Sequence, residues 1–251
     1  MLFRSFRAGL LASTSALALA GAANAQGTGL VGLYGGVGLG WEANSGSVKV
    51  NEGGGDRYEW PDKLSNSGIF GNLFAGYRVP IAGPWVIGGE AKLTFGGAYG
   101  YVEDAQNTGG DGAHNHMSAR SKFGLNIGLT AGYQMTNGML PFVRVGYAGK
   151  TMKMVGSVPS AGSMINTTKW LSGMEFGAGI DIPIGVIGGA LNMPAFLRAE
   201  TSYTAMFGGG AARSKYNPGA GEVKYRPDSF QAGVAFRSEE HTSELQSQST
   251  I

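Results

Sequence analysis

The sequence predicts an all-β fold class, an eight-stranded antiparallel up-and-down transmembrane β-barrel preceded by a cleavable signal peptide. One observation is a long alternating segment at residues 117–135, MSARSKFGLNIGLTAGYQM, with apolar side chains at every second position from Phe123 to Met135. Ordinary strands have about 5–6 residues, whereas a tilted strand that crosses a bilayer needs roughly 9–11. The other two observations are a secretory signal at the N-terminus and a regular alternation of long and short connections.

The composition supports β structure and excludes several classes of function. The 251 residues include 45 glycines, which suit closely packed β structure, and the 43% hydrophobic and 14% charged residues argue against disorder. The net charge of +2 does not suggest nucleic acid as a partner. The chain has no cysteine, so a disulfide framework, a zinc–thiolate cluster and a thiol nucleophile are excluded.

Both ends of the chain are predicted to lie outside the barrel. A basic start, an apolar run at 8–20 and the small-residue site Ala23-Asn24-Ala25 predict a signal peptide at residues 1–25. No later apolar run reaches the ~18 residues of a transmembrane helix, so any membrane-spanning segment has to be a strand. Residues 237–247, RSEEHTSELQS, resemble the translation of a sequencing-library adapter, and 237–251 are expected to form a non-native disordered tail. The predicted barrel therefore comprises residues 26–236.

The predicted strands share period-two alternation. In chain order they are 30–41, 68–79, 85–95, 117–135, 140–150, 169–182, 194–203 and 229–236. The first alternates apolar side chains up to Trp41 with Tyr34 and glycines. In the second, Arg78 faces the opposite side of the strand from the apolar side chains. The third carries Glu90 and Lys92 on its polar side, and the fourth is the long alternating segment.

The last four strands continue this pattern. The fifth alternates apolar residues with Arg144 and Lys150, and the sixth alternates them with Glu175, Asp181 and glycines. The seventh and eighth strands alternate in the same way, and the eighth ends at residue 236, which is the predicted end of the barrel. Each strand therefore has one face suited to lipid and one suited to a lumen.

The connections differ in length in a regular order. Long polar connections at 42–67, 96–116, 151–168 and 204–227 alternate with shorter ones at 80–84, 136–138 and 183–193. Outer-membrane barrels have short periplasmic turns and long extracellular loops. A soluble β-sandwich also alternates in this way, so strand length, the signal peptide and the loop asymmetry decide in favour of the barrel.

The parity assigns candidate residues to each side of the wall. The predicted lumen set contains both signs of charge: Arg78, Glu90, Lys92, Arg120, Lys122, Arg144, Glu175, Arg198 and Glu200. The predicted lipid-facing set is apolar or aromatic: Trp41, Trp85, Phe123, Leu125, Ile127, Leu129, Tyr133, Tyr147, Trp170, Phe176 and Tyr203. An eight-stranded barrel is only wide enough for side chains to fill, so the charges are expected to form a paired plug rather than an aqueous channel.

The chain resembles a family of eight-stranded outer-membrane barrels that includes the OmpA transmembrane domain, the opacity proteins and the small "porin family" proteins. The resemblance rests on GLYGGVGLGW, IGGEAKL, PFVRVGYA and FQAGVAF and covers residues 26–236. It implies a monomer in the outer membrane of a Gram-negative bacterium, with outer-membrane lipids, the assembly machinery and periplasmic chaperones as partners. In the family the last strand ends on an aromatic residue. Here Ser238 occupies the position at which the alternation predicts that aromatic residue.

The function expected from this resemblance is a non-enzymatic one, in envelope structure or in interactions made by the surface loops. The alternatives are a small passive pore and, third, a lipid A-modifying enzyme. No catalytic, cofactor-binding or metal-binding residues are predicted. The loop residues Glu103, Asp104, Asp111, His114 and His116 fit no strong metal template. His116 and Ser118 are similar to the His-x-Ser pair of lipid A deacylase barrels, but no carboxylate follows them within the fourth strand.

Overall fold

The structure, a computed structural model, describes eight stretches of the chain: residues 32–51, 57–59, 64–104, 115–158, 163–186, 194–207, 210–213 and 222–239. The predicted signal peptide, residues 1–25, and the predicted tail from residue 240 onward lie outside these stretches. Within the described residues no helix has the length and apolarity needed to cross a membrane.

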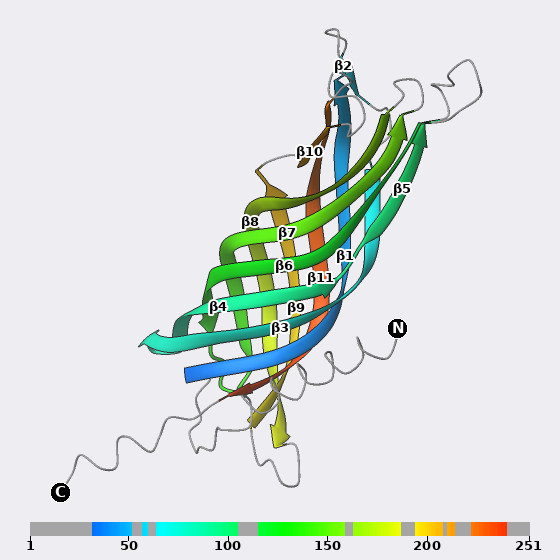
Figure 1. The fold of residues 1–251 in the computed structure, drawn as a ribbon. Coiled ribbons are helices and arrows are strands. Elements are labelled where there is room, and N and C mark those ends of the chain that lie inside the picture. The colour runs from blue at the N-terminus through cyan, green and yellow to red at the C-terminus, as the bar shows by residue number, and fades with distance from the viewer. Residues whose placement is uncertain are drawn as a thin grey trace, which may run out of the picture.

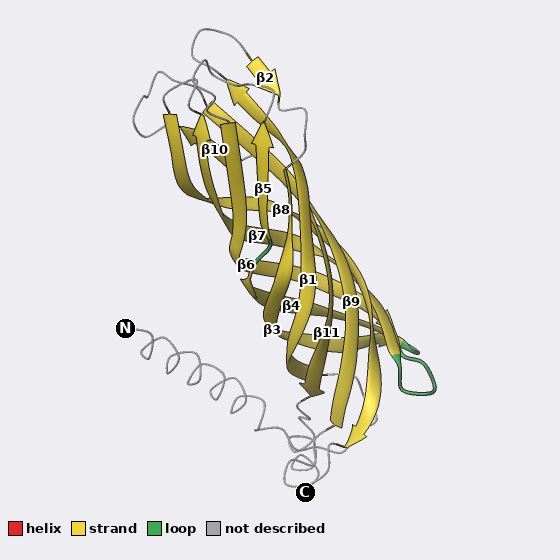
Figure 2. Ribbon diagram, turned by 90° about the vertical axis from the view of Figure 1, so that its right-hand side faces the viewer, coloured by secondary structure: helices red, strands yellow, loops and turns green. Residues whose placement is uncertain are grey.

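The described strands form one antiparallel sheet that closes on itself (Figures 1 and 2). Eight long strands form the ring: β1 (Gly32–Asn51), β3 (Leu64–Ala82), β4 (Trp85–Gly96), β6 (Asn115–Tyr133), β7 (Leu140–Val158), β8 (Ser163–Val186), β9 (Pro194–Met206) and β11 (Glu222–Glu239). Neighbours along the chain pair in sequence, and pairing of β11 with β1 closes the barrel. The predicted eight-stranded antiparallel barrel is confirmed.

Three short strands extend the ring at the end that is uppermost in Figures 1 and 2, here called the upper end. They are β2 (Arg57–Glu59), β5 (Tyr99–Asp104) and β10 (Gly210–Arg213). β2 pairs with β1, β5 pairs with β3 and β6, and β10 pairs with β11. β5 therefore continues the course of β4 after a two-residue interruption.

The strands are longer than the sequence predicts. β1, β7, β8 and β11 run well into the segments expected to be long loops, and β7 pairs with β8 as far as Val158 and Ser163. β11 also continues to Glu239, so the predicted end of the barrel at residue 236 is wrong by three residues. The extensions at the upper end are not predicted because their outward side chains are polar.

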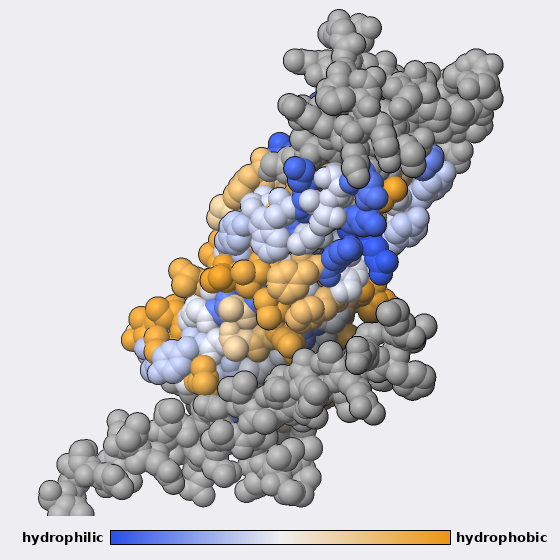
Figure 3. All heavy atoms as spheres, viewed as in Figure 1, coloured by the Kyte–Doolittle hydropathy of each residue, from blue (hydrophilic) through white to orange (hydrophobic). Residues whose placement is uncertain are grey.

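Polarity reverses along the barrel, which explains the missed extensions. Over the lower part the large outward side chains are apolar, including Val37, Ile127 and Val234, whereas the inward ones include most of the buried charged residues, with aromatic rings packed among them. Over the upper part the outward side chains include Ser45 and Thr168, and the inward ones are apolar. On the face in Figure 3, hydrophobic residues gather in a band and hydrophilic residues gather above it. The lower part is therefore the membrane-spanning zone, and the upper part projects beyond it.

A β-bulge in β6 changes which residues face inward. Between Ser121, opposite Met152, and Gly124, opposite Lys150, β6 advances three residues while β7 advances two. From Gly124 onward even-numbered residues of β6 face inward, but in its upper part odd-numbered residues do. The bulge therefore resets the alternation at the point where the polarity reverses.

The bulge overturns two predicted lumen positions. Arg120 precedes the extra residue and so lies on the outward parity of upper β6, and Lys122 lies within the bulge itself. Both side chains are exposed on the outside of the barrel rather than in the lumen.

Inward glycines make room for aromatic rings in the narrow interior. A Cβ on Gly76 would lie 2.4 Å from the Tyr34 ring, and one on Gly36 would lie 2.4 Å from the Phe74 ring. Each ring thus lies across a glycine of the neighbouring strand, because β1 and β3 pair with Tyr34 opposite Gly76 and Gly36 opposite Phe74. Close packing of this kind is one reason for the high glycine content.

Candidate functional site

The interior of the barrel is the candidate site, and its lowest part is organised around Asp181. This fully buried carboxylate accepts hydrogen bonds from three guanidinium groups, those of Arg78, Arg198 and Arg237. Arg78 Nη1 lies 2.8 Å from Oδ2, and Arg198 Nε lies 2.7 Å from Oδ1. Arg237 also pairs with Glu239. One carboxylate thus joins β3, β9 and β11 to β8.

A second group of charges lies beside the first. Glu90 accepts hydrogen bonds from Arg144 Nη1 at 2.7 Å and from the Tyr34 hydroxyl at 2.9 Å, and it also pairs with Arg198. Arg144 pairs in addition with Glu175 and with Glu200.

Lys92 and Asn126 complete this group. Lys92 Nζ lies 3.0 Å from Glu200 Oε1 and 3.4 Å from Glu175 Oε1. The Asn126 amide donates to Glu175 Oε2 at 2.6 Å. With the groups around Asp181 these residues form a continuous network, here called the lumen network. Its cations are Arg78, Lys92, Arg144, Arg198 and Arg237, and its anions are Glu90, Glu175, Asp181, Glu200 and Glu239.

Aromatic rings line the lumen network. The Arg237 guanidinium lies 4.1 Å from the Tyr34 ring centroid, and the Arg198 guanidinium lies 4.5 Å from that of Phe74 and 4.7 Å from that of Phe142. Cation–π contacts of this kind are worth more when the cation is shielded from water. The network is therefore held by packing as well as by charge.

A separate ion pair lies above the lumen network. Lys150 Nζ donates to Glu42 Oε1 at 2.9 Å, to Asn44 Oδ1 at 2.9 Å and to Ser229 Oγ at 2.8 Å. These three acceptors satisfy the ammonium group. Glu42 also accepts from Ser121 Oγ at 2.8 Å. This pair connects β1 to β7 across the lumen.

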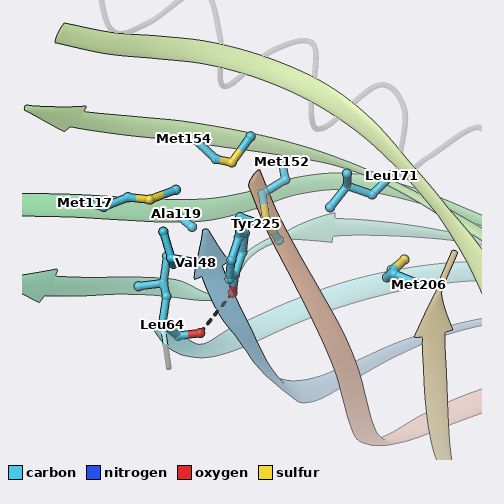
Figure 4. Close-up of a cluster of buried hydrophobic side chains, with 9 residues drawn as sticks. All are labelled: Val48, Leu64, Met117, Ala119, Met152, Met154, Leu171, Met206 and Tyr225. Carbon is cyan, nitrogen blue, oxygen red and sulfur yellow. Dashed lines mark hydrogen bonds between the residues drawn. The ribbon is translucent and has the colours of Figure 1, made fainter. Parts of the chain in front are cut away.

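The uppermost part of the interior is apolar (Figure 4). Nine fully buried side chains form this upper core: Val48, Leu64, Met117, Ala119, Met152, Met154, Leu171, Met206 and Tyr225. The Tyr225 hydroxyl donates to the Leu64 carbonyl at 3.1 Å. Burial raises the pKa of this phenol well above its usual range, so it remains a donor. Above the membrane the barrel thus has a core like that of a soluble protein.

The interior contains a small cavity at the level of the lumen network. The cavity beside Asn72, Lys92 and Gln231 has a volume of about 20 Å³, which is enough for a single water. Nearby, the buried Oδ1 of Asn72 and Oε1 of Gln231 have no protein partner, which is the setting in which a buried water is usually found.

The structure brings seven of the nine predicted lumen residues together. Six of them, Arg78, Glu90, Lys92, Arg144, Glu175 and Arg198, are buried, and Glu200 is nearly so. All seven belong to the lumen network. The other two are the exposed Arg120 and Lys122 described above.

Sequence reasoning missed five charged residues of the interior. Asp181 and Lys150 were placed on the inward parity but were not included in the predicted charge set. Glu42 was assigned to a loop, although it continues the inward parity of β1, and Arg237 and Glu239 were assigned to the tail. The alternation alone would have found the first three.

The predicted lipid-facing residues lie on the outside of the barrel. Ten of the eleven are exposed, and Leu125 is half-buried. Several form contacts along the upper edge of the apolar band: the Phe95 and Phe123 ring centroids are 5.7 Å apart, and those of Phe123 and Trp170 are 6.4 Å apart. Trp170 Nε1 also donates to the Tyr147 hydroxyl at 3.2 Å. These four residues are called the upper aromatic row.

His116 and Ser118 lie above this row on the outward side of β6. The Ser118 hydroxyl donates to the Val155 carbonyl at 3.2 Å, and the His116 ring lies 6.1 Å from that of Tyr101. No hydrogen bond joins His116 to Ser118 among the described side chains. The pairing of β5 with β6 nevertheless places Glu103 directly opposite His116 in the register. Asp111 and His114 lie outside the described residues.

Comparisons with known proteins agree with this architecture. OprG of Pseudomonas aeruginosa, an outer membrane protein, is 11% identical over 83% of this chain and 97% of its own, with a TM-score of 0.50. Two further similarities have lower scores. Ail of Yersinia pestis is 11% identical over 83% of this chain and 99% of its own, with a TM-score of 0.35. The outer membrane protease OmpT of Escherichia coli is 8% identical over 82% of this chain and 96% of its own, with a TM-score of 0.45.

Only the first of these scores is high enough to support a shared fold. No curated protein matches the sequence. The family described as "Outer membrane protein beta-barrel domain" matches residues 9–237, which is most of the chain. The protein therefore belongs to this family of β-barrels and is located in the outer membrane of a Gram-negative bacterium.

Proposed function

We propose that the protein is a non-enzymatic outer-membrane barrel with a closed lumen, which serves envelope structure and presents its upper connections for surface interactions. The observation that carries this proposal is the filling of the lumen by the lumen network, the Lys150–Glu42 pair and the upper core. The charged side chains of the lumen network and of the Lys150–Glu42 pair form ion pairs, and the cavity beside the network has a volume of about 20 Å³. Paired charges and packed side chains of this kind oppose the passage of a hydrated ion through the described part of the interior.

The partners follow from the outer surface. The apolar band fits the hydrocarbon of outer-membrane lipids, and pairing of β11 with β1 leaves no long strand of the ring with a free edge. An unpaired edge is the usual route by which one sheet joins another. The closed ring supports a monomer, and the partners proposed for its route to the membrane are periplasmic chaperones and the outer-membrane assembly machinery.

Single-channel recording in planar bilayers tests the closed lumen. The unmodified barrel is expected to give no large, steady conductance, whereas a known eight-stranded pore measured beside it gives the sensitivity of the assay. Neutral salt at high concentration should not open the lumen, because buried ion pairs are screened much less than exposed ones. A steady conductance that scales with salt would instead support the passive pore.

A second candidate function is a hydrolase that acts on membrane lipids. The observation in its favour is that Glu103 of β5 pairs in register with His116, although no carboxylate follows His116 and Ser118 within the fourth predicted strand. A serine, a histidine and an orienting carboxylate are the parts of a nucleophilic hydrolase. Against it, Ser118 donates to the Val155 carbonyl rather than to His116.

Mass spectrometry of lipid A decides between these two functions. Cells that express the protein, and cells that express Ser118→Ala or His116→Ala at the same level, are compared for the loss of an acyl chain. Unchanged lipid A in all three supports the non-enzymatic barrel. Loss of an acyl chain with the unmodified protein alone would establish the hydrolase.

A further inference from the structure

Three cations lie together on the outside of β6 and β7. Arg120 and Lys122 are exposed and Lys153 is half-buried, and together they are called the cationic cluster. Arg120 and Lys153 are direct cross-strand partners, and Lys122 lies in the adjacent bulge. No ion pair or hydrogen bond joins any of the three to a described side chain. The bulge thus turns outward two cations that regular alternation would have placed inside.

The repulsion between Arg120 and Lys153 has to be offset by another interaction. Directly opposed like charges on neighbouring strands destabilise a sheet. The described surroundings of the pair offer Tyr99, opposite Arg120 on β5, and Thr168, opposite Lys153 on β8, and neither carries a negative charge. An external anion bound between the two strands would offset the repulsion.

The height of the cluster identifies the layer of the membrane that it faces. Trp170 of the upper aromatic row pairs with Thr151, and Lys153 lies two residues further up β7. At about 3.3 Å per residue and a strand tilt of about 40°, Lys153 lies roughly 5–7 Å above the row. The headgroup layer of a bilayer extends about 5–7 Å beyond the hydrocarbon on each side. The cluster is therefore level with the lipid headgroups of the upper leaflet, which is the outer leaflet because the long connections of such barrels are extracellular.

We propose that the cationic cluster binds the phosphate groups of a phosphorylated glycolipid in the outer leaflet of the membrane. The planar guanidinium of Arg120 suits bidentate contact with phosphate, and the lysine ammonium groups add point charges on either side. The rings of Phe123 and Trp170 lie just below, where they contact the upper part of the acyl chains. A diphosphorylated headgroup fits a site with three cations that have no anionic partner among the described residues better than a headgroup with a single phosphate.

Binding is measured by native mass spectrometry on the full chain in a mild detergent. The probes are diphosphoryl lipid A, the same lipid after enzymatic removal of its phosphates, and inorganic phosphate. The test variant is Arg120→Gln/Lys153→Gln. Its matched control is Lys49→Gln/Lys224→Gln, which removes two cations from another directly opposed pair, on β1 and β11. Lys49 lies eight residues above Trp41, about 20 Å beyond the apolar band by the same geometry and so above the headgroups.

The unmodified protein is expected to prefer diphosphoryl lipid A over the dephosphorylated lipid and to bind inorganic phosphate weakly. The test variant should lose about tenfold or more in affinity for the phosphorylated lipid alone, since each cation near a membrane surface contributes on the order of a fivefold change. The control pair and a charge-preserving Arg120→Lys/Lys153→Arg variant should bind like the unmodified protein. Equal binding of both lipids by the unmodified protein, or equal losses in the test and control variants, would overturn the proposal. Heat-modifiable gel migration of each variant shows that it is folded.

Discussion

Replacing Asp181 by asparagine should destabilise the barrel more than any comparable change on its surface. The substitution keeps the shape of the side chain and removes its charge. Arg198 still has Glu90 as a partner, and Arg237 still has Glu239, but Arg78 has no other carboxylate partner among the described residues. One buried guanidinium is therefore left without a counter-ion, and removing one partner of a buried pair costs about 3–5 kcal/mol.

The measurement is urea unfolding of the barrel in lipid vesicles, followed by tryptophan fluorescence and by the heat-modifiable gel shift. The matched control is Asp228→Asn, at an exposed position of β11, which should change the free energy of unfolding by no more than about 0.5 kcal/mol. Combining Asp181→Asn with Arg78→Met should recover part of the loss, because the stranded charge is removed. If Asp181→Asn and Asp228→Asn prove equally mild, the lumen carboxylates are solvated and the closed lumen is refuted.

Three further predictions concern the other zones of the barrel. Lys150→Met leaves Glu42 without its cation and should cost about 3 kcal/mol in the same assay, whereas a loss below about 1 kcal/mol would place water at the pair. Met152→Ala opens a cavity in the upper core and should cost about 2–5 kcal/mol, and the lipid-facing Met174→Ala should cost clearly less; equal effects would mean that the upper core is not packed. Deleting Lys122 removes the extra residue of the bulge and should prevent assembly, seen as loss of the heat-modifiable band, whereas Lys122→Ala should assemble normally.

The alternation of the sequence predicts the barrel and most of its lumen because each membrane-spanning strand separates two environments of opposite polarity. Glu175 and Arg198 were assigned to the interior from parity alone, and Asp181 stands on the same parity. Parity shows which side a residue faces but not its contacts. The convergence of three arginines on one carboxylate therefore could not be predicted, because it depends on strands distant in sequence.

Two features escaped prediction for physical reasons. Above the apolar band the outside of the barrel faces water and the inside is apolar, so the upper strands have the polarity expected of a loop between membrane strands. The bulge at Lys122 leaves no composition signal, and a single extra residue reverses the side assigned to Arg120. Arg237 was missed for a different reason. The residues around it resemble an adapter sequence and were assigned to the tail, although Arg237 continues the inward-facing alternation of the last strand.

The reversal of polarity along the wall also fixes how deeply the barrel sits in its membrane. A shift of one alternation step toward the periplasm, two residues or about 7 Å along the strand, would draw Lys153 and Asp228 into hydrocarbon. A cation at the bilayer midplane costs about 2–4 kcal/mol and less toward the interface, so several strands together oppose such sinking. A shift in the other direction would expose Trp170 and Phe123 to water. The strands alone thus set the depth of insertion. The upper connections can vary in sequence and length without changing the position of the barrel in the bilayer.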